Sequence, residues 1–440
     1  MSLGGGTWTT QSKVLPGAYI NVVSAKQGIP ASERGIVAFP MELDWGPVGV
    51  PTLVTESQFS SNCRDILGYN YESDEMKPFR EIFRHAQKLY LYRLAKNPVS
   101  ASGNLSGGTK LATAVYPGAR GNKITIQVKS SVDEEEKKIV STLLDGTQVD
   151  SQTVGTAAEL KDNPFVVFEK AVSLSDETVT LSGGSNGEDV TGTEWQAFLD
   201  AMESYYFNIL GSTVSDETTK KLIVAYTQRM REKVGKKFQC VLFQHAADYE
   251  GTVSVENEVT DEGAAKASAV YWVSGALAGC AVNSELTNTT YDGEYVINTA
   301  YRQSDLENAL QSGKFIFHRQ DEEVRVLEDI NTLVTTTADK GDVFKQNMTI
   351  RVIDQIALDI ANVFNNTYNG KVPNDEDGRV GLKSEIVNIL NQLQTQRAIQ
   401  NFTDDDVTIS QGDGPKAVLG SISVQVTGMM THLYLTVMIE

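Results

Sequence analysis

A glycine-rich pentapeptide offers this chain's clearest match to a catalytic motif. Residues 183–187 read Gly-Gly-Ser-Asn-Gly and fit the Gly-x-Ser-x-Gly pattern of a nucleophile elbow. A real elbow places its serine on a strained turn between a buried strand and a helix. Here the residues after the motif give no helix start before Thr193. We therefore interpret the motif as a flexible hinge, with a serine hydrolase that uses Ser185 and His245 or His318 as the alternative.

Residue types that bind metals and cofactors are scattered along the chain. The four histidines occur singly, and none of the three cysteines belongs to a CxxC pair. The stretch at 374–378, Asn-Asp-Glu-Asp-Gly, carries oxygen ligands but lacks the alternate spacing and bidentate glutamate of a calcium loop. Neither common nucleotide-binding glycine motif occurs. We expect no cofactor, and interpret 374–378 as a solvated turn, with a bound cation as the alternative.

The composition describes an ordinary globular protein with an acidic surface. The 440 residues are 40% hydrophobic and carry a formal net charge of −19, which predicts two to four domains. Such a charge disfavours nucleic acid and anionic membranes as partners. No secretory signal pattern is present, and the apolar run at 267–282 is too short to span a bilayer. Its Gly275 and Gly279 indicate a helix packed closely against a sheet.

Hydrophobic patterning divides the chain into four parts. Residues 1–18 read as an extended arm, and residues 19–97 together with 189–345 alternate strands with helices. Short strands about ten residues apart fill 98–188, as in a small β-sandwich or barrel. Residues 346–440 contain two amphipathic helices and then strands. The predicted fold class is α+β multidomain, with a central α/β core, an inserted and separable β domain, and a C-terminal α+β domain with extended terminal arms.

Three local patterns give sharper structural predictions. The run LIVAY at 222–226 reads as a buried strand before a charged helix. The segments around 314–319 and 323–328 predict a hairpin. Residues 422–426 and 433–439 alternate with period two around Gly428, which predicts a terminal hairpin.

The order of several short sequences resembles the contractile-tail sheath family, which comprises sheath proteins of contractile phage tails and of phage-tail-like bacteriocins. The resemblance is strongest in the C-terminal third and is supported by earlier landmarks. These sequences lie at 324–334 (VRVLEDINTLV), 351–360 (RVIDQIALDI), 369–390, 398–402 (AIQNF), 35–47 (GIVAFPMELDWGP) and 116–122 (YPGARGN).

The resemblance implies a structural protein with no catalytic activity and no cofactor. Such a protein polymerises with itself into a helix of six-start rows around an inner tail tube protein, and it meets a baseplate and a tail terminator at the ends. Contraction then drives the tube through a cell envelope. The family places the protein in the bacterial host cytoplasm during assembly and then in a virion or phage-tail-like particle. A non-contractile tail or baseplate protein is the alternative.

The resemblance also implies contact by strand exchange, in which terminal arms complete sheets in neighbouring subunits. An open edge strand is a template for a strand from another chain. The residues expected in this exchange are Val14, Leu15, Leu433, Leu435, Val437 and Ile439. Charged residues of the C-terminal helices are expected near the tube or neighbouring subunits. These are Arg351, Asp354, Lys371, Arg379, Lys383 and Arg397.

Overall fold

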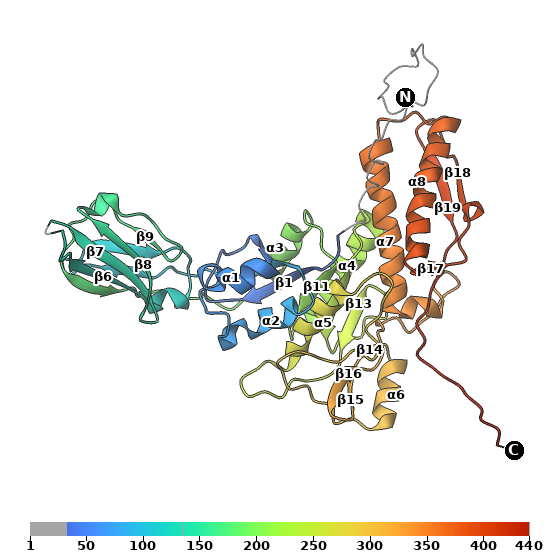
Figure 1. The fold of residues 1–440 in the computed structure, drawn as a ribbon, viewed down its shortest axis with the longest axis horizontal. Coiled ribbons are helices and arrows are strands. Elements are labelled where there is room, and N and C mark those ends of the chain that lie inside the picture. The colour runs from blue at the N-terminus through green and yellow to red at the C-terminus, as the bar shows by residue number, and fades with distance from the viewer. Residues whose placement is uncertain (1–32, 135, 440) are drawn as a thin grey trace, which may run out of the picture.

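The computed structural model of the protein describes residues 33–134 and 136–439. The predicted arm at 1–18, with Val14 and Leu15, lies outside them. Figure 1 shows the β insertion at one end, the α/β region in the centre, and a pair of long helices standing beside that centre. The last residues extend away from the base of the helix pair. The predicted α+β multidomain fold class is confirmed.

A largely parallel sheet forms the central region. Among the described residues it has seven strands, in the order β14-β13-β12-β11-β1-β3-β2. Neighbouring strands are parallel except for β2, which pairs antiparallel with β3. The strands are β1 (Ile36–Glu42), β2 (Pro51–Thr55), β3 (Lys88–Leu94), β11 (Ile209–Ser212), β12 (Gln239–Phe243), β13 (Thr252–Val255) and β14 (Lys314–Phe315).

Helices cover both faces of this sheet, which explains why its strands are apolar on both sides. On β1, Val37 faces the core beneath one helix layer, and Ala38 faces the other core. The first layer contains α1 (Glu56–Leu67), α2 (Lys77–Phe83) and α5 (Ala269–Gly279). The second contains α3 (Gly192–Met202) and α4 (Glu217–Arg229).

Two glycines bring α5 close to α2. A Cβ atom on Gly275 would lie 2.2 Å from the carbonyl oxygen of Ile82, and one on Gly279 would lie 2.1 Å from that of His85. Any larger residue would clash with this backbone. The predicted packing of this helix against the sheet is confirmed by its contacts with β11 and β1, while the two glycines allow the close approach to α2 and the residues after it.

The predicted strand at 222–226 is wrong, because these residues lie within α4. Asp216 caps the start of that helix, and its side chain accepts a hydrogen bond from the Thr219 backbone N–H at 2.7 Å. Ile223, Thr227 and Met230 then follow at helical spacing and are buried. A short apolar run is compatible with a buried helix as well as with a buried strand. Here the capping residue Asp216 was the sequence signal for a helix.

The insertion contains two antiparallel sheets that enclose one core. One sheet has the order β10-β6-β7-β8, and the other β4-β5-β9. The strands are β4 (Ser102–Asn104), β5 (Lys110–Ala114), β6 (Ile124–Ser130), β7 (Lys138–Leu144), β8 (Thr147–Val154), β9 (Val166–Phe168) and β10 (Glu177–Thr180).

The insertion shares a tryptophan with the central region. Trp45 follows β1, yet its side chain lies in the core of the insertion and is 1% exposed. Its ring meets Tyr116 edge-to-face at 5.4 Å and lies 6.2 Å from Phe165. Arg93, at the end of β3, donates hydrogen bonds to the carbonyls of Gly46 at 2.8 Å and Pro117 at 2.6 Å. The insertion is therefore attached to the central region by these side-chain contacts as well as by the two peptide connections at its ends.

A hairpin and a short helix follow the central sheet. The predicted hairpin is confirmed, because β15 (Phe317–Gln320) pairs antiparallel with β16 (Glu323–Val326). Helix α6 (Gln303–Gln311) packs beside β14.

The C-terminal region contains the predicted helix pair, α7 (Asn347–Val363) and α8 (Glu376–Thr395). Short strands follow, namely β17 (Ile399–Gln400), β18 (Val407–Gln411), β19 (Val418–Ile422) and β20 (Gln425–Val426). The predicted terminal hairpin is wrong, because β19 pairs with β18 and β20 pairs with β17. Residues 427–439 form no helix or strand. Within the described chain, no helix is long and apolar enough to cross a membrane.

Candidate functional site

The structure does not assemble the residues of the hydrolase alternative. The hydroxyl of Ser185 accepts a hydrogen bond from the Gly187 backbone N–H at 3.1 Å. His245 lies beside Glu217, with 3.0 Å between Nδ1 and Oε2. His318 is on β15, where burial lowers its pKa. Among the hydrogen bonds of the described residues, none joins Ser185 to either histidine.

The glycine motif closes the insertion. A Cβ atom on Gly184 would lie 2.4 Å from the carbonyl oxygen of Gly118, and one on Gly187 would lie 2.0 Å from that of Lys96. Gly187 also has a φ of +92°, which favours glycine. The segment therefore packs tightly against the backbone where the chain enters the insertion, whereas we predicted a flexible hinge.

The acidic turn at 374–378 caps the amino-terminal end of α8. The Asp375 side chain accepts a hydrogen bond from the Gly378 backbone N–H at 2.8 Å, as a helix N-cap does. Asn374 donates through Nδ2 to the carbonyls of Pro415 at 3.1 Å and Ala417 at 2.8 Å. Within the described residues, no three His, Cys, Asp or Glu side chains are grouped closely enough to hold a metal ion.

Two of the charged residues predicted near the tube or neighbours are buried within their own chain. Asp354 of α7 is 8% exposed and pairs with Arg231, which donates to its two carboxylate oxygens at 2.6 and 2.8 Å. Burial alone would lower the pKa of Arg231, but the neighbouring Asp354 carboxylate raises it. Arg351 is 4% exposed and contacts Asp329 at 3.2 Å. Arg351 and Asp354 therefore form ion pairs within the subunit, and their position near the tube or a neighbour stays a prediction.

These pairs belong to a polar network at the first turns of α7. Asn347 donates through Nδ2 to Asp329 and to the carbonyl of Ile330, both at 2.9 Å. Its side-chain oxygen accepts from Gln239 of β12, also at 2.9 Å. The network ties α7 directly to the central sheet, so the C-terminal helices are anchored to that sheet.

The other four charged residues lie on or near the surface. Lys371 and Arg397 are exposed, and Lys383 is half-buried on α8. Arg379 donates to the backbone and side-chain oxygens of Asn374, both at 3.0 Å, so it also braces the acidic turn. Their approach to a tube or a neighbour stays a prediction.

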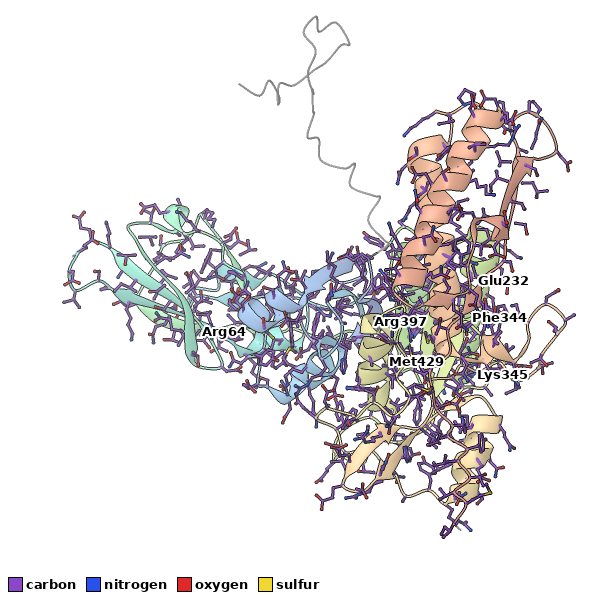
Figure 2. The ribbon with its side chains drawn as sticks, turned by 45° about the vertical axis from the view of Figure 1, so that its right-hand side comes forward. Arg64, Glu232, Phe344, Lys345, Arg397 and Met429 are labelled. Carbon is purple, nitrogen blue, oxygen red and sulfur yellow. The ribbon has the colours of Figure 1, made fainter. Side chains whose placement is uncertain are left out.

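The last residues of the described chain expose apolar side chains at every second position. Leu433, Leu435, Val437 and Ile439 are between 72% and 94% exposed. The intervening positions Tyr434 and Met438 are exposed as well. We call residues 427–439 the C-terminal arm. It leaves the helix pair where the Thr427 backbone N–H donates to the carbonyl of Ala398 at 3.0 Å, close to Arg397 and Met429 in Figure 2.

The short sheets of the C-terminal region have edge strands whose outer side pairs with no other strand of the described chain. The pairs β18–β19 and β17–β20 each form a sheet of only two strands among the described residues, so each strand has one edge without a partner. Leu419 of β19 is 64% exposed. Unpaired backbone N–H and C=O groups of this kind can accept a further strand. The C-terminal region thus combines an extended apolar segment with edges able to receive one.

Family models for phage tail sheath proteins match successive parts of the chain. They are described as the tail sheath protein Gp18 domain III N-terminal region, the phage tail sheath protein beta-sandwich domain, the phage tail sheath protein central domain and the phage tail sheath C-terminal domain. The matched residues are 34–94, 96–186, 188–332 and 339–440, respectively.

Similar proteins match over nearly the whole chain. The phage-like element PBSX protein XkdK of Bacillus subtilis is 31% identical over 468 residues, with 99% of each chain covered. The crystal structure of a sheath tail protein from Desulfitobacterium hafniense has a TM-score of 0.82 and 36% identity, and covers 93% of this chain and 96% of that one. The helical sheath of the anti-feeding prophage in its contracted state shares the fold, with a TM-score of 0.56, 12% identity, and coverage of 97% and 99%.

Proposed function

Because the chain belongs to the phage tail sheath family, we propose that it polymerises around a tail tube as a contractile sheath, whose contraction drives the tube through a cell envelope. The role of this family is structural, and the chain is a component of a virion or phage-tail-like particle. In the proposal it needs no catalytic step and no cofactor. Its partners are further copies of itself in six-start rows, the tube protein, the baseplate and the tail terminator.

The exposed C-terminal arm is the observation that carries this proposal. Burying Leu433, Leu435, Val437 and Ile439 in a neighbour would contribute about 6–12 kcal/mol. Fixing the backbone of the strand at 433–439 costs a similar amount, about 7–14 kcal/mol. A single arm therefore binds weakly through this face, and backbone pairing and the opposite face must supply the rest. This balance suits a subunit that stays monomeric when dilute and polymerises when many contacts form together.

The unpaired edges of β17 to β20 are the proposed acceptors of a neighbour's arm. The other proposed donor is the N-terminal arm with Val14 and Leu15, which lies outside the described residues. The proposal divides the chain into an N-terminal arm (1–18), a central domain (19–97 with 189–345), an inserted domain (98–188) and a C-terminal domain (346–440). Lys371, Arg379, Lys383 and Arg397 are its candidates for contact with the tube or neighbouring subunits.

A substitution inside the C-terminal arm tests the proposal. The full-length Leu435→Asp and Val437→Asp variants should unfold at the temperature of the wild type, because both residues are exposed in the subunit. They should form no tubes in negative-stain electron micrographs, because a carboxylate would have to enter an apolar contact. Val132→Asp is the matched control, since Val132 is 93% exposed in the insertion. Normal tubes from both arm variants would contradict the strand-exchange model.

A further inference from the structure

A cavity of about 950 Å³ lies at the carboxyl edge of the central sheet. Strands β1 and β3 end at it with Glu42 and Leu94, and residues 213–216, which follow β11, line it as well. Strand β1 lies between β3 and β11 in the sheet. From β1 the chain first adds β2 and β3 on one side and later adds β11 to β14 on the other. Parallel sheets open a crevice for ligands at such a switch point. Residues 186–192, which leave the insertion, form the opposite wall.

The cavity is lined by acidic residues together with apolar ones. Its lining, all from described residues, includes no lysine, arginine or histidine. Its carboxylates are those of Glu42, Asp44, Glu75, Glu188, Asp189 and Asp216. Three of them, Glu42, Glu75 and Asp189, make no hydrogen bond or salt bridge with the described residues. The rings of Phe79, Trp195 and Tyr271 contribute to the lining.

A basic turn lies at the opposite edge of the same sheet. Arg229 ends α4, residues 230–234 continue it as one π-helical turn, and residues 235–238 lead to β12, which starts at Gln239. We call residues 229–237 the basic turn. Because β12 runs parallel to β11, this turn is at the amino edge, while the cavity is at the carboxyl edge. The basic residues of the turn are Arg229, Arg231, Lys233, Lys236 and Lys237. Figure 2 places Glu232 of this turn on the side of the C-terminal helices, away from the insertion.

The lysines of the turn carry its uncompensated charge. Arg229 and Arg231 form ion pairs with carboxylates of their own chain. By contrast, Lys236 and Lys237 donate to backbone carbonyls and form no ion pair within the described residues. Lys233 is exposed and forms no ion pair within the described residues. Even with the carboxylate of Glu232 counted, the three lysines give the turn a net positive charge on a chain whose formal net charge is −19.

We propose that the turn at 229–237 of one copy docks into the acidic cavity of a second copy. The proposal rests on the polymerisation proposed above and identifies one of its contacts. Strands of four to seven residues separate the turn and the cavity by roughly 15–20 Å, so the two cannot meet within one subunit. Opposite charges at this contact offset the repulsion between acidic subunits.

The geometry of this contact agrees with a filament. The turn and the cavity are different surfaces at opposite edges of one sheet, so their contact is head-to-tail. A head-to-tail contact repeats from copy to copy, and it produces a ring where the rotation closes and an open helix where it does not. At every length the filament keeps one free cavity at one end and one free turn at the other.

Cysteine cross-linking tests the contact directly in the full-length chain. The three native cysteines are buried, so new surface cysteines would be the reactive ones. A mixture of Asp189→Cys and Lys233→Cys proteins should yield a disulfide-linked dimer under mild oxidation. The double variant should yield a ladder of longer products. Each single variant alone should stay monomeric on a non-reducing gel.

Charge reversal provides the second measurement. Lys233→Glu and Asp189→Lys should each raise the protein concentration needed for polymerisation by about tenfold or more, because like charges would then face each other. Joining both changes in one chain should restore assembly. Lys161→Glu and Glu169→Lys, at exposed positions of the insertion, are the matched controls. Thermal unfolding of each variant as a monomer checks that the fold is kept.

The outcomes separate this inference from the proposed function. If the wild type forms tubes while the cysteine pair gives no cross-link and the reversals assemble normally, the docking is overturned and the sheath role stands. If the wild type forms no polymer under any condition, the proposed function fails and the docking fails with it. A ladder from the double variant together with rescue by the paired reversal supports the contact.

Discussion

Replacing Trp45 tests whether the central region and the insertion are energetically coupled. The indole belongs to the segment after β1, but it fills the core of the insertion against Tyr116 and Phe165. In Trp45→Ala the core loses a side chain that is 1% exposed and gains a cavity. Such truncations cost about 3–5 kcal/mol. For a domain the size of the insertion, this loss corresponds to a fall in melting temperature of more than about 10 °C.

The assay is differential scanning calorimetry of the full-length monomer. We expect the wild type to unfold with the insertion and the central region coupled, and Trp45→Ala to unfold the insertion first. Trp45→Phe is the control. The indole Nε1 is buried without a hydrogen-bond partner among the described residues, so phenylalanine removes some volume but no hydrogen bond. A loss below about 1 kcal/mol in Trp45→Ala would refute the reasoning.

The same contact changes what we expect from deleting the insertion. Removing residues 98–188 exposes Trp45 to water and leaves the Arg93 guanidinium without the carbonyl of Pro117. The deletion alone should therefore yield a poorly soluble protein. The deletion combined with Trp45→Ser should be soluble and folded by circular dichroism. Equal solubility of the two deletion proteins would show that Trp45 does not couple the regions.

Three further predictions follow from the described contacts. Asp354→Ala leaves Arg231 buried without its carboxylate and should cost about 3–5 kcal/mol in urea unfolding, whereas a loss below about 1 kcal/mol would contradict the anchoring role. The Arg80 hydrogen bond lowers the pKa of Glu294, so its stabilisation is present above the ordinary value of 4.5 and is lost as pH falls through the native pKa. Melting temperatures of Glu294→Gln should accordingly fall less steeply than those of the wild type below about pH 4.5, and parallel curves would argue against this pair. Truncation after Met430 should change the unfolding free energy of the monomer by less than about 0.5 kcal/mol while abolishing tubes, and a destabilised monomer would speak against strand exchange.

Local patterns predicted the elements whose partners are nearby. The hairpin at 317–326 and the helix pair α7–α8 follow from alternation and helical periodicity, and both are confirmed. Helix α1 was missed, although Thr55 and Gln58 carry the reciprocal bonds of a capping box at its start. That spacing of threonine and glutamine is a signal the sequence offered.

Elements with distant partners were predicted poorly. Residues 433–439 alternate as a strand should, but alternation does not say which chain provides the neighbouring strand. The resemblance placed Arg351 and Asp354 near the tube or neighbouring subunits, but it did not predict that both are buried in ion pairs of their own chain. Their partners Asp329 and Arg231 lie far from them in sequence or on another element. No local pattern encodes such pairs.

The anchoring of α7 has a mechanical consequence. The helix has 17 residues and a length of about 25 Å, and its polar network lies in the first half. The other half stands clear of the central sheet, alongside α8 (Figure 1). Helix α7 is therefore fixed to the central sheet at its first half and free of that sheet at its second half. The connection between β18 and β19 contacts Asn374 in the loop between α7 and α8, so a pull on this connection acts on the free end and produces a torque on the central sheet. The C-terminal arm leaves from the base of the helix pair, so a pull on the arm acts beside the anchored end.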